Sequence, residues 1–155
     1  MHRITTVLPV ILAVLCLAVT GCGKGVPKGS STEVKELVLQ IAQDYYRDRL
    51  AAACYQQVSG IPLDIVGLDV DYGWLRNKAG SEEQAKATLR VVDKAMEQLN
   101  LTVENVRTED VDEEVGKARC ACDIRAGSTT DAISFTAQYN DDGRLYVEVF
   151  GLGDD

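Results

Sequence analysis

Histidine is nearly absent from this 155-residue chain, since the one copy is His2 at the amino end. A chain without an internal imidazole cannot form a Ser–His or Cys–His nucleophile pair. It also lacks the histidine ligands that many zinc sites use. No phosphate-binding loop, nucleophile elbow or protein-kinase motif occurs in the sequence. We therefore expect a protein that is not an enzyme and that needs no cofactor and no metal.

Basic residues are outnumbered, with 16 Lys and Arg against 24 Asp and Glu and a net charge of −8. Binding to nucleic acid phosphates needs clustered Lys and Arg, so we expect no nucleic acid partner. The acidic balance also disfavours a domain that lies flat on anionic lipid. It is compatible with a basic protein as partner.

Long apolar runs are lacking too, because the longest, from about Val7 to Val19, is shorter than the roughly 20 residues of a membrane-spanning helix. This run follows the basic start Met1-His2-Arg3 and ends at Val19-Thr20-Gly21-Cys22. A basic flank, an apolar core and small residues before a cleavage point are typical of a secretory signal peptide.

The sequence Val19-Thr20-Gly21-Cys22 resembles the lipobox of bacterial lipoproteins. In that family the signal is cut just before the Cys, whose thiol receives a diacylglycerol and whose new amino terminus is acylated. The resemblance implies lipidation of Cys22 and a stable anchor in the cell envelope. Because Gly23 is not Asp, the Gram-negative sorting pattern implies the outer membrane. Cleavage would remove His2 and Arg3 and leave a net charge of −9.

These features predict three regions. Residues 1–21 are the expected signal peptide, and residues 22–31 are the lipidated Cys and a flexible tether rich in Gly, Ser, Lys and Pro. Residues 32–155 are the expected single domain, which is long enough to bury a core.

Two helices are predicted within this domain. The first runs from Thr32 to about Tyr55, with Ser30 and Glu33 at capping-box spacing; the second begins near Ser81 and Gln84, which have the same spacing, and stops near Asn100. Each carries an apolar stripe at helical spacing. The stripes are Val34, Leu37, Val38, Ile41 and Tyr45 in the first helix and Ala85, Leu89, Val92, Met96 and Leu99 in the second.

The rest of the chain predicts an antiparallel meander. Residues 101–108 form a strand with imperfect alternation, and residues 117–125, 133–139 and 145–149 alternate more regularly. The last turn, Asn140 to Gly143, should be a three-residue loop, because that register pairs Tyr139 with Leu145 and keeps the apolar residues on one face. It would place Gly143 at positive φ.

We therefore expect an α+β fold in which two helices pack on one face of an antiparallel sheet of about four strands. Cystatin-like and nuclear-transport-factor-like domains have a similar outline, which implies no activity. Residues 66–74 also alternate and predict a further strand at about 65–74. Alternatively, this segment is a loop that presents Tyr72 and Trp74 to a partner, since aromatic residues often anchor interfaces.

Three cysteines remain after the expected cleavage and lipidation: Cys54, Cys120 and Cys122. Two cysteines that are separated by one residue on a strand have Cα atoms about 6.8 Å apart and parallel side-chain directions, which disfavours a bridge between them. We expect Cys54 to form a disulfide with Cys120 or Cys122 and so tie the first helix to the sheet. The alternatives are buried, reduced cysteines or a redox or metal site.

Acidic residues gather in two places. Glu109 to Glu114 joins two predicted strands and is a solvated turn, a weak Ca²⁺ site or a contact for a basic partner. Asp69 and Asp71 begin like an EF-hand loop, but Gly80 stands where the final Glu is needed. As a pair of carboxylates they could serve a hydrolase.

The sequence supports three hypotheses of function. The first is a lipid-anchored, non-enzymatic interaction or structural module of the bacterial envelope. The second is an inhibitor or immunity lipoprotein that neutralises a basic toxin or a cell-wall hydrolase, which the acidic balance favours. The third is a glycan hydrolase that uses paired carboxylates.

Overall fold

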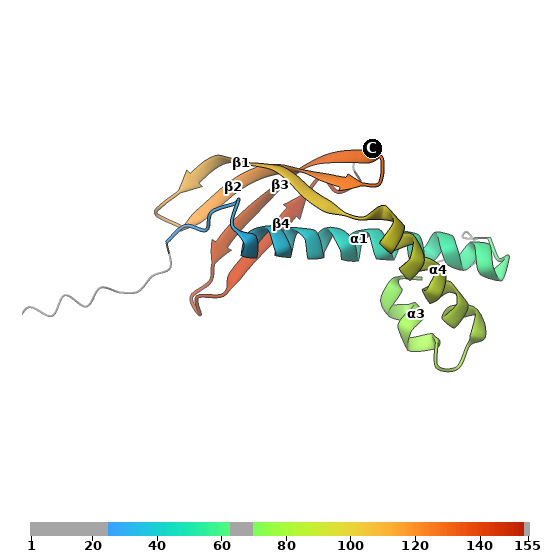
Figure 1. Ribbon diagram of the computed structural model, residues 1–155. Helices are drawn as coiled ribbons and strands as arrows, with labels where there is room; N and C mark the ends of the chain where they lie inside the picture. Colours follow the sequence, from blue (N-terminus) through green and yellow to red (C-terminus); the bar gives the residue numbers. More distant parts are fainter. Residues whose placement is uncertain (1–24, 63–69, 154–155) are drawn as a thin grey trace, which may run out of the picture.

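The computed structural model describes residues 25–62 and 70–153 (Figure 1). The expected signal peptide and Cys22 lie outside these ranges, as do residues 65–69 of the predicted extra strand. The elements in chain order are α1 (Thr32–Ser59), α3 (Tyr72–Lys78), α4 (Glu83–Leu99), β1 (Thr102–Asp112), β2 (Lys117–Ala126), β3 (Thr129–Tyr139) and β4 (Leu145–Phe150). The strands form one antiparallel sheet in the order β1-β2-β3-β4, which confirms the predicted α+β class.

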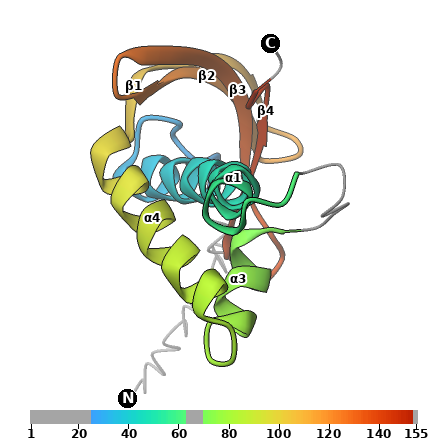
Figure 2. The same ribbon diagram turned by 90° about the vertical axis from the view of Figure 1, so that its right-hand side faces the viewer.

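Helix α1 runs through the middle of the molecule. The sheet curves over one side of it, and α3 and α4 pack along its carboxyl half on the other side (Figures 1 and 2). Thus α1 itself covers the concave face of the sheet, whereas α4 packs mainly on α1. None of the helices in the described ranges is long and apolar enough to span a membrane.

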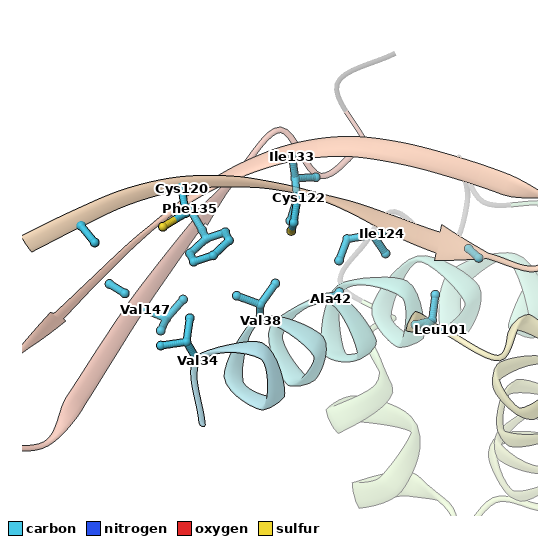
Figure 3. Close-up of a cluster of buried hydrophobic side chains, with 13 residues drawn as sticks. Val34, Val38, Ala42, Leu101, Cys120, Cys122, Ile124, Ile133, Phe135 and Val147 are labelled. Carbon is cyan, nitrogen blue, oxygen red and sulfur yellow. The ribbon is translucent and has the colours of Figure 1, made fainter. Parts of the chain in front are cut away.

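The larger core lies between α1 and the sheet (Figure 3). Val34, Val38 and Ala42, at helical spacing, point from α1 toward the strands. They meet the inward-facing residues of β2 and β3, whose alternation matches the predicted pattern. The fully buried strand residues in this core include Cys120, Cys122, Ile124, Phe135 and Ala137.

A second core lies on the opposite side of α1. Ala51, Cys54 and Tyr55 pack there against Leu75 of α3 and against α4. Since each helical residue turns about 100°, a step of 20 residues places Cys54 about 200° around the helix from Val34. The apolar stripe therefore changes sides along α1, and this change needs a second layer to cover it.

The ends of α1 differ slightly from the prediction. Ser31, rather than Ser30, is the N-cap, and its hydroxyl accepts a hydrogen bond from the Val34 amide at 3.4 Å. The helix continues to Ser59, beyond the predicted end. It stops at Gly60, which adopts the left-handed conformation that glycine favours at helix ends.

Helix α4 begins at Glu83 without a side-chain cap. The predicted capping box of Ser81 and Gln84 is not formed, because the Ser81 hydroxyl donates to the carbonyl of Lys78 at 3.2 Å instead. The helix ends at Asn100, as predicted, and this residue adopts the left-handed conformation.

The predicted strand at 65–74 is wrong where the structure describes it. Residues from Tyr72 onward form α3, and the Asp71 carboxylate caps this helix by accepting a hydrogen bond from the Trp74 amide at 2.6 Å. Period-two alternation was misleading here because Asp71 is a strong N-cap residue and because Gly73 weakens a strand.

The last hairpin has the predicted register. Tyr139 pairs with Leu145, and Ala137 pairs with Val147. Gly143 closes the three-residue loop at φ 71°, and its amide donates to the Asn140 carbonyl at 2.8 Å. A residue with a β-carbon is strained at this positive φ, so the turn requires glycine.

Strand β1 explains the imperfect alternation seen in its sequence. Its pairing with β2 shifts between Glu104 and Arg107, where Asn105 has a positive φ, and again before Asp110. Such bulges bend a strand, and the sheet does curve around α1. The strand also continues to Asp112. The acidic run Glu109 to Glu114 was predicted to connect two strands, but most of it belongs to β1. Opposite charges across the ladder favour this extension, because Asp110 faces Arg119.

The segment predicted as a flexible tether is folded from Gly25 onward. Pro27 and Gly29 are buried, and Val26 packs against the sheet core. Gly29 lies so close to Cys120 that a β-carbon at this position would overlap the cysteine sulfur. Of the predicted tether, residues 25–31 therefore belong to the domain.

Because α1 is shared by both cores, we expect them to unfold together. Phe135→Ala in the sheet core should lower the free energy of unfolding by about 3–5 kcal/mol, and Leu75→Ala in the second core by about 2–5 kcal/mol. Urea unfolding followed by circular dichroism should show one transition for each variant. Val115→Ala, at an exposed position, is the control and should change stability by less than about 0.5 kcal/mol. Two separate transitions in either core variant would contradict the shared role of α1.

The close contact at Gly29 makes a second prediction. Gly29→Ala should cost about 1–3 kcal/mol of stability through overpacking. Gly25→Ala, with no atom within 4 Å of the new β-carbon, should cost less than about 0.5 kcal/mol. In a Cys120→Ala background the cost of Gly29→Ala should shrink, because the colliding sulfur is gone. An unchanged cost in that background would show that the contact is not the cause.

Candidate binding cleft

The concave face of the sheet extends past the amino end of α1. Val111 pairs with Ala118 and Tyr139 pairs with Leu145, which places both on the side of the sheet that α1 covers elsewhere. At this end the two hairpin tips, β1–β2 and β3–β4, enclose an open cleft of about 990 Å³. Its lining consists of Gly25, Val26, Val111, Glu113, Glu114, Val115, Gly116, Tyr139 and residues 140–143.

Two valines of this cleft are unusually exposed. Val115 is 64% exposed and Val111 is 47% exposed, and both come from the β1–β2 hairpin. Val26 and Tyr139 add further apolar surface from the start of the domain and from β3. The cleft therefore offers apolar contacts that the described part of the chain leaves open to solvent.

The rim of the cleft is acidic. Glu113 and Glu114 come from the first hairpin tip, and Asp141 and Asp142 from the second. No Lys or Arg lines the cleft, although Lys117 and Arg144 each lie one residue after a lining residue. Four carboxylates around an apolar floor make this site suitable for a ligand with positive charge and apolar groups.

Side-chain hydrogen bonds fix both tips. The Asp112 carboxylate accepts a hydrogen bond from the Val115 amide at 3.0 Å. The Asn140 side-chain oxygen accepts one from the Arg144 amide at 2.8 Å. These bonds hold the turns that carry the acidic residues, so the rim is preformed.

The amino end of the described chain also lies at the cleft, since Gly25 and Val26 form part of its lining. In Figure 1 the first described residues and both hairpin tips lie at one end of the molecule. Helix α3 and the carboxyl end of α1 lie at the opposite end. The cleft is thus next to the point at which the chain enters the domain.

The aromatic residues predicted to bind a partner have intramolecular roles. The Tyr72 hydroxyl donates to Asp93 at 2.6 Å, and this hydrogen bond, with burial, raises the pKa of Tyr72. The Trp74 ring packs edge-on against Tyr55, with 5.3 Å between the ring centroids. Both side chains are half-buried and attach α3 to its neighbours, so they are not part of the cleft.

The predicted disulfide is not present. Cys54, Cys120 and Cys122 are all free thiols. Cys54 lies in the second core, whereas the other two lie in the sheet core, because the turn of α1 directs Cys54 away from the strands. Burial raises the pKa of all three thiols, and that of Cys122 reaches about 11. In residues 25–62 and 70–153 no group of three or more His, Cys, Asp or Glu side chains is placed to hold a metal.

The sequence predicted an acidic run at Glu109 to Glu114 and a hairpin turn at Asn140 to Gly143, but not that the two lie at the same site. In an antiparallel meander the first and third turns are always at the same end of the sheet. That rule could have placed Glu113 beside Asp141. The apolar part of the cleft was harder to foresee, because it depends on where α1 begins relative to the strands.

Because the thiolate is the reactive form, the raised pKa values predict slow alkylation in the folded protein. At pH 8 a pKa of about 11 lowers the thiolate fraction of Cys122 about a hundredfold relative to the ordinary value of 9. Iodoacetamide followed by intact-mass measurement without reductant should therefore label Cys54, Cys120 and Cys122 slowly in buffer and completely in denaturant. A mass lower by about 2 Da, with one thiol labelled in denaturant, would instead indicate a disulfide.

No protein-family model, no curated protein and no solved structure matches this chain. The cystatin-like or nuclear-transport-factor-like outline therefore stays a prediction.

Proposed function

We propose that this protein is a bacterial envelope lipoprotein, anchored through Cys22, whose domain is a non-enzymatic interaction module. The observation that carries this proposal is the position of the cleft beside Gly25, three residues after the lipobox Cys. The binding site and the anchor then belong to the same end of the molecule.

The distance between anchor and domain supports this arrangement. Three residues span at most about 11 Å, even when fully extended. Since residues 25–31 pack on the domain, the tether is limited to the few residues after Cys22. The anchor would hold the cleft close to the lipid surface, where it meets partners that lie in or near the same membrane.

The chemistry of the cleft favours binding over catalysis. A glycan hydrolase needs one carboxylic acid that stays protonated near neutral pH, which proteins achieve by apolar burial. Glu113, Glu114, Asp141 and Asp142 are all exposed on hairpin tips. Asp71, from the other carboxylate pair, is the cap of α3. These environments suit the attraction of a cation rather than acid–base chemistry.

A second candidate function is favoured by the acidic rim. An inhibitor or immunity lipoprotein would use it to bind a basic toxin or a basic cell-wall hydrolase. Exposed carboxylates speed the encounter with a positively charged surface, and salt weakens this effect. Under this alternative, binding would block the activity of the captured protein.

The anchor makes a direct prediction. Cys22→Ser should abolish labelling with radioactive palmitate in a bacterial host and should release the protein from the membrane fraction into the soluble envelope fraction. The matched control is Cys16→Ser, which changes a cysteine within the expected signal and leaves the lipobox intact. It should be labelled and fractionate like the unaltered protein. Equal labelling of the Cys22→Ser variant would refute the lipoprotein assignment.

A further inference from the structure

The geometry points to a ligand class for the cleft: we propose that it binds a cationic, amphipathic peptide segment of a membrane-associated partner. This inference rests on the proposed function, because it uses the anchor at Cys22 to place the cleft at the membrane. It goes further by naming the chemistry that the site recognises.

The apolar part of the cleft argues for a ligand with apolar side chains. Val115 and Val111 are the two most exposed valines among the described residues, and they line the same cleft as the half-buried Tyr139. Apolar groups concentrated in a concave site bind by removing area from water. A purely polar cation would leave these apolar side chains exposed to water.

The charge of the rim selects the sign of the ligand. Two carboxylates on each hairpin tip face a cleft without a lining cation. An anionic segment would be repelled from both sides, whereas lysine or arginine side chains can extend from an apolar stem to the rim. Charge and apolar area together therefore favour an amphipathic segment with basic residues.

The open shape and the position of the cleft favour a peptide segment. A small-molecule site of roughly 300–1,000 Å³ buries most of its ligand, whereas this cleft of about 990 Å³ is open to solvent and can admit part of a longer chain. The cleft is open, and Gly25 at its edge is within about 11 Å of Cys22 by chain length. Amphipathic segments with a Lys- and Arg-rich face lie in the lipid interface, at this height, which makes them suitable occupants.

The test uses the lipidated chain in phosphatidylcholine vesicles. The probe is a fluorescent 12-residue peptide of alternating lysine and leucine, and its binding to empty vesicles is subtracted. Two further peptides replace leucine by serine, at unchanged charge, or lysine by glutamate. We expect the lysine–leucine peptide to bind, the lysine–serine peptide to bind at least about tenfold more weakly, and the glutamate–leucine peptide not to bind.

Matched variants separate the cleft from overall charge. The cleft variant combines Glu113→Gln, Glu114→Gln, Asp141→Asn and Asp142→Asn. The control removes four exposed carboxylates from the helices by Asp44→Asn, Asp48→Asn, Glu83→Gln and Glu97→Gln. At physiological salt, charges more than about 8 Å away are largely screened. We therefore expect affinity to fall about tenfold or more in the cleft variant and less than about threefold in the control.

A second pair of variants tests the apolar contact. Val115→Ser should weaken binding of the lysine–leucine peptide about threefold or more, whereas Val91→Ser, at an exposed valine of α4, should leave it unchanged.

Three results would overturn the ligand class. They are equal loss of binding in both four-site variants, equal binding of the leucine and serine peptides, and no binding by unaltered protein that is present on the vesicles. Palmitate labelling of the same preparation keeps the two proposals distinguishable. A labelled protein that does not bind refutes the cleft ligand alone, whereas an unlabelled protein refutes the anchor.

Discussion

The fold depends on the burial of α1 on two sides. One side of its amino half meets the sheet, and the opposite side of its carboxyl half meets α3 and α4. The Tyr46 hydroxyl donates a hydrogen bond to Asp131 of β3 and so adds a polar contact between this helix and the sheet. Burial raises the pKa of Tyr46 to about 12, so the hydroxyl keeps its proton at neutral pH. Neither the sheet nor the α3–α4 pair could bury its apolar face without this helix.

The cleft is a consequence of how this helix and the sheet are matched. The β1–β2 and β3–β4 hairpins extend beyond the amino end of α1, so the inward-facing positions at their tips have no helix above them. Residues 25–31 cover part of the gap, with Gly29 pressed against Cys120. The remaining gap is the cleft, and its apolar floor is the end of the same face that forms the core.

Much of the fold could be predicted from local residue spacing and turn chemistry. Helical spacing gave both long helices, and period-two alternation with one turn rule gave the exact partner of Tyr139 in the last hairpin. Among the residues that the structure describes, the strand predicted at 65–74 was wrong because Asp71 ends the alternating run by capping a helix. The Cys54 disulfide was wrong because the direction of one side chain on a long helix depends on the layer that covers it. Local residue spacing does not determine such tertiary contacts.

The candidate site was only half predictable for the same reason. Its charges lie in turns that the sequence marked, but its apolar floor depends on the point at which α1 begins.

An exposed cleft of this kind favours modest affinity. Solvent-exposed charge pairs contribute roughly 0.2–1 kcal/mol each, and the apolar floor adds the burial of a few side chains. If the anchor holds the domain at the membrane, however, a partner in the same membrane meets the cleft at a raised effective concentration. Binding then resembles an intramolecular reaction, so a site of low affinity can still be largely occupied. A short tether, an acidic rim and a shallow apolar floor are thus physically consistent with one another, because the anchor supplies the proximity that the cleft alone does not.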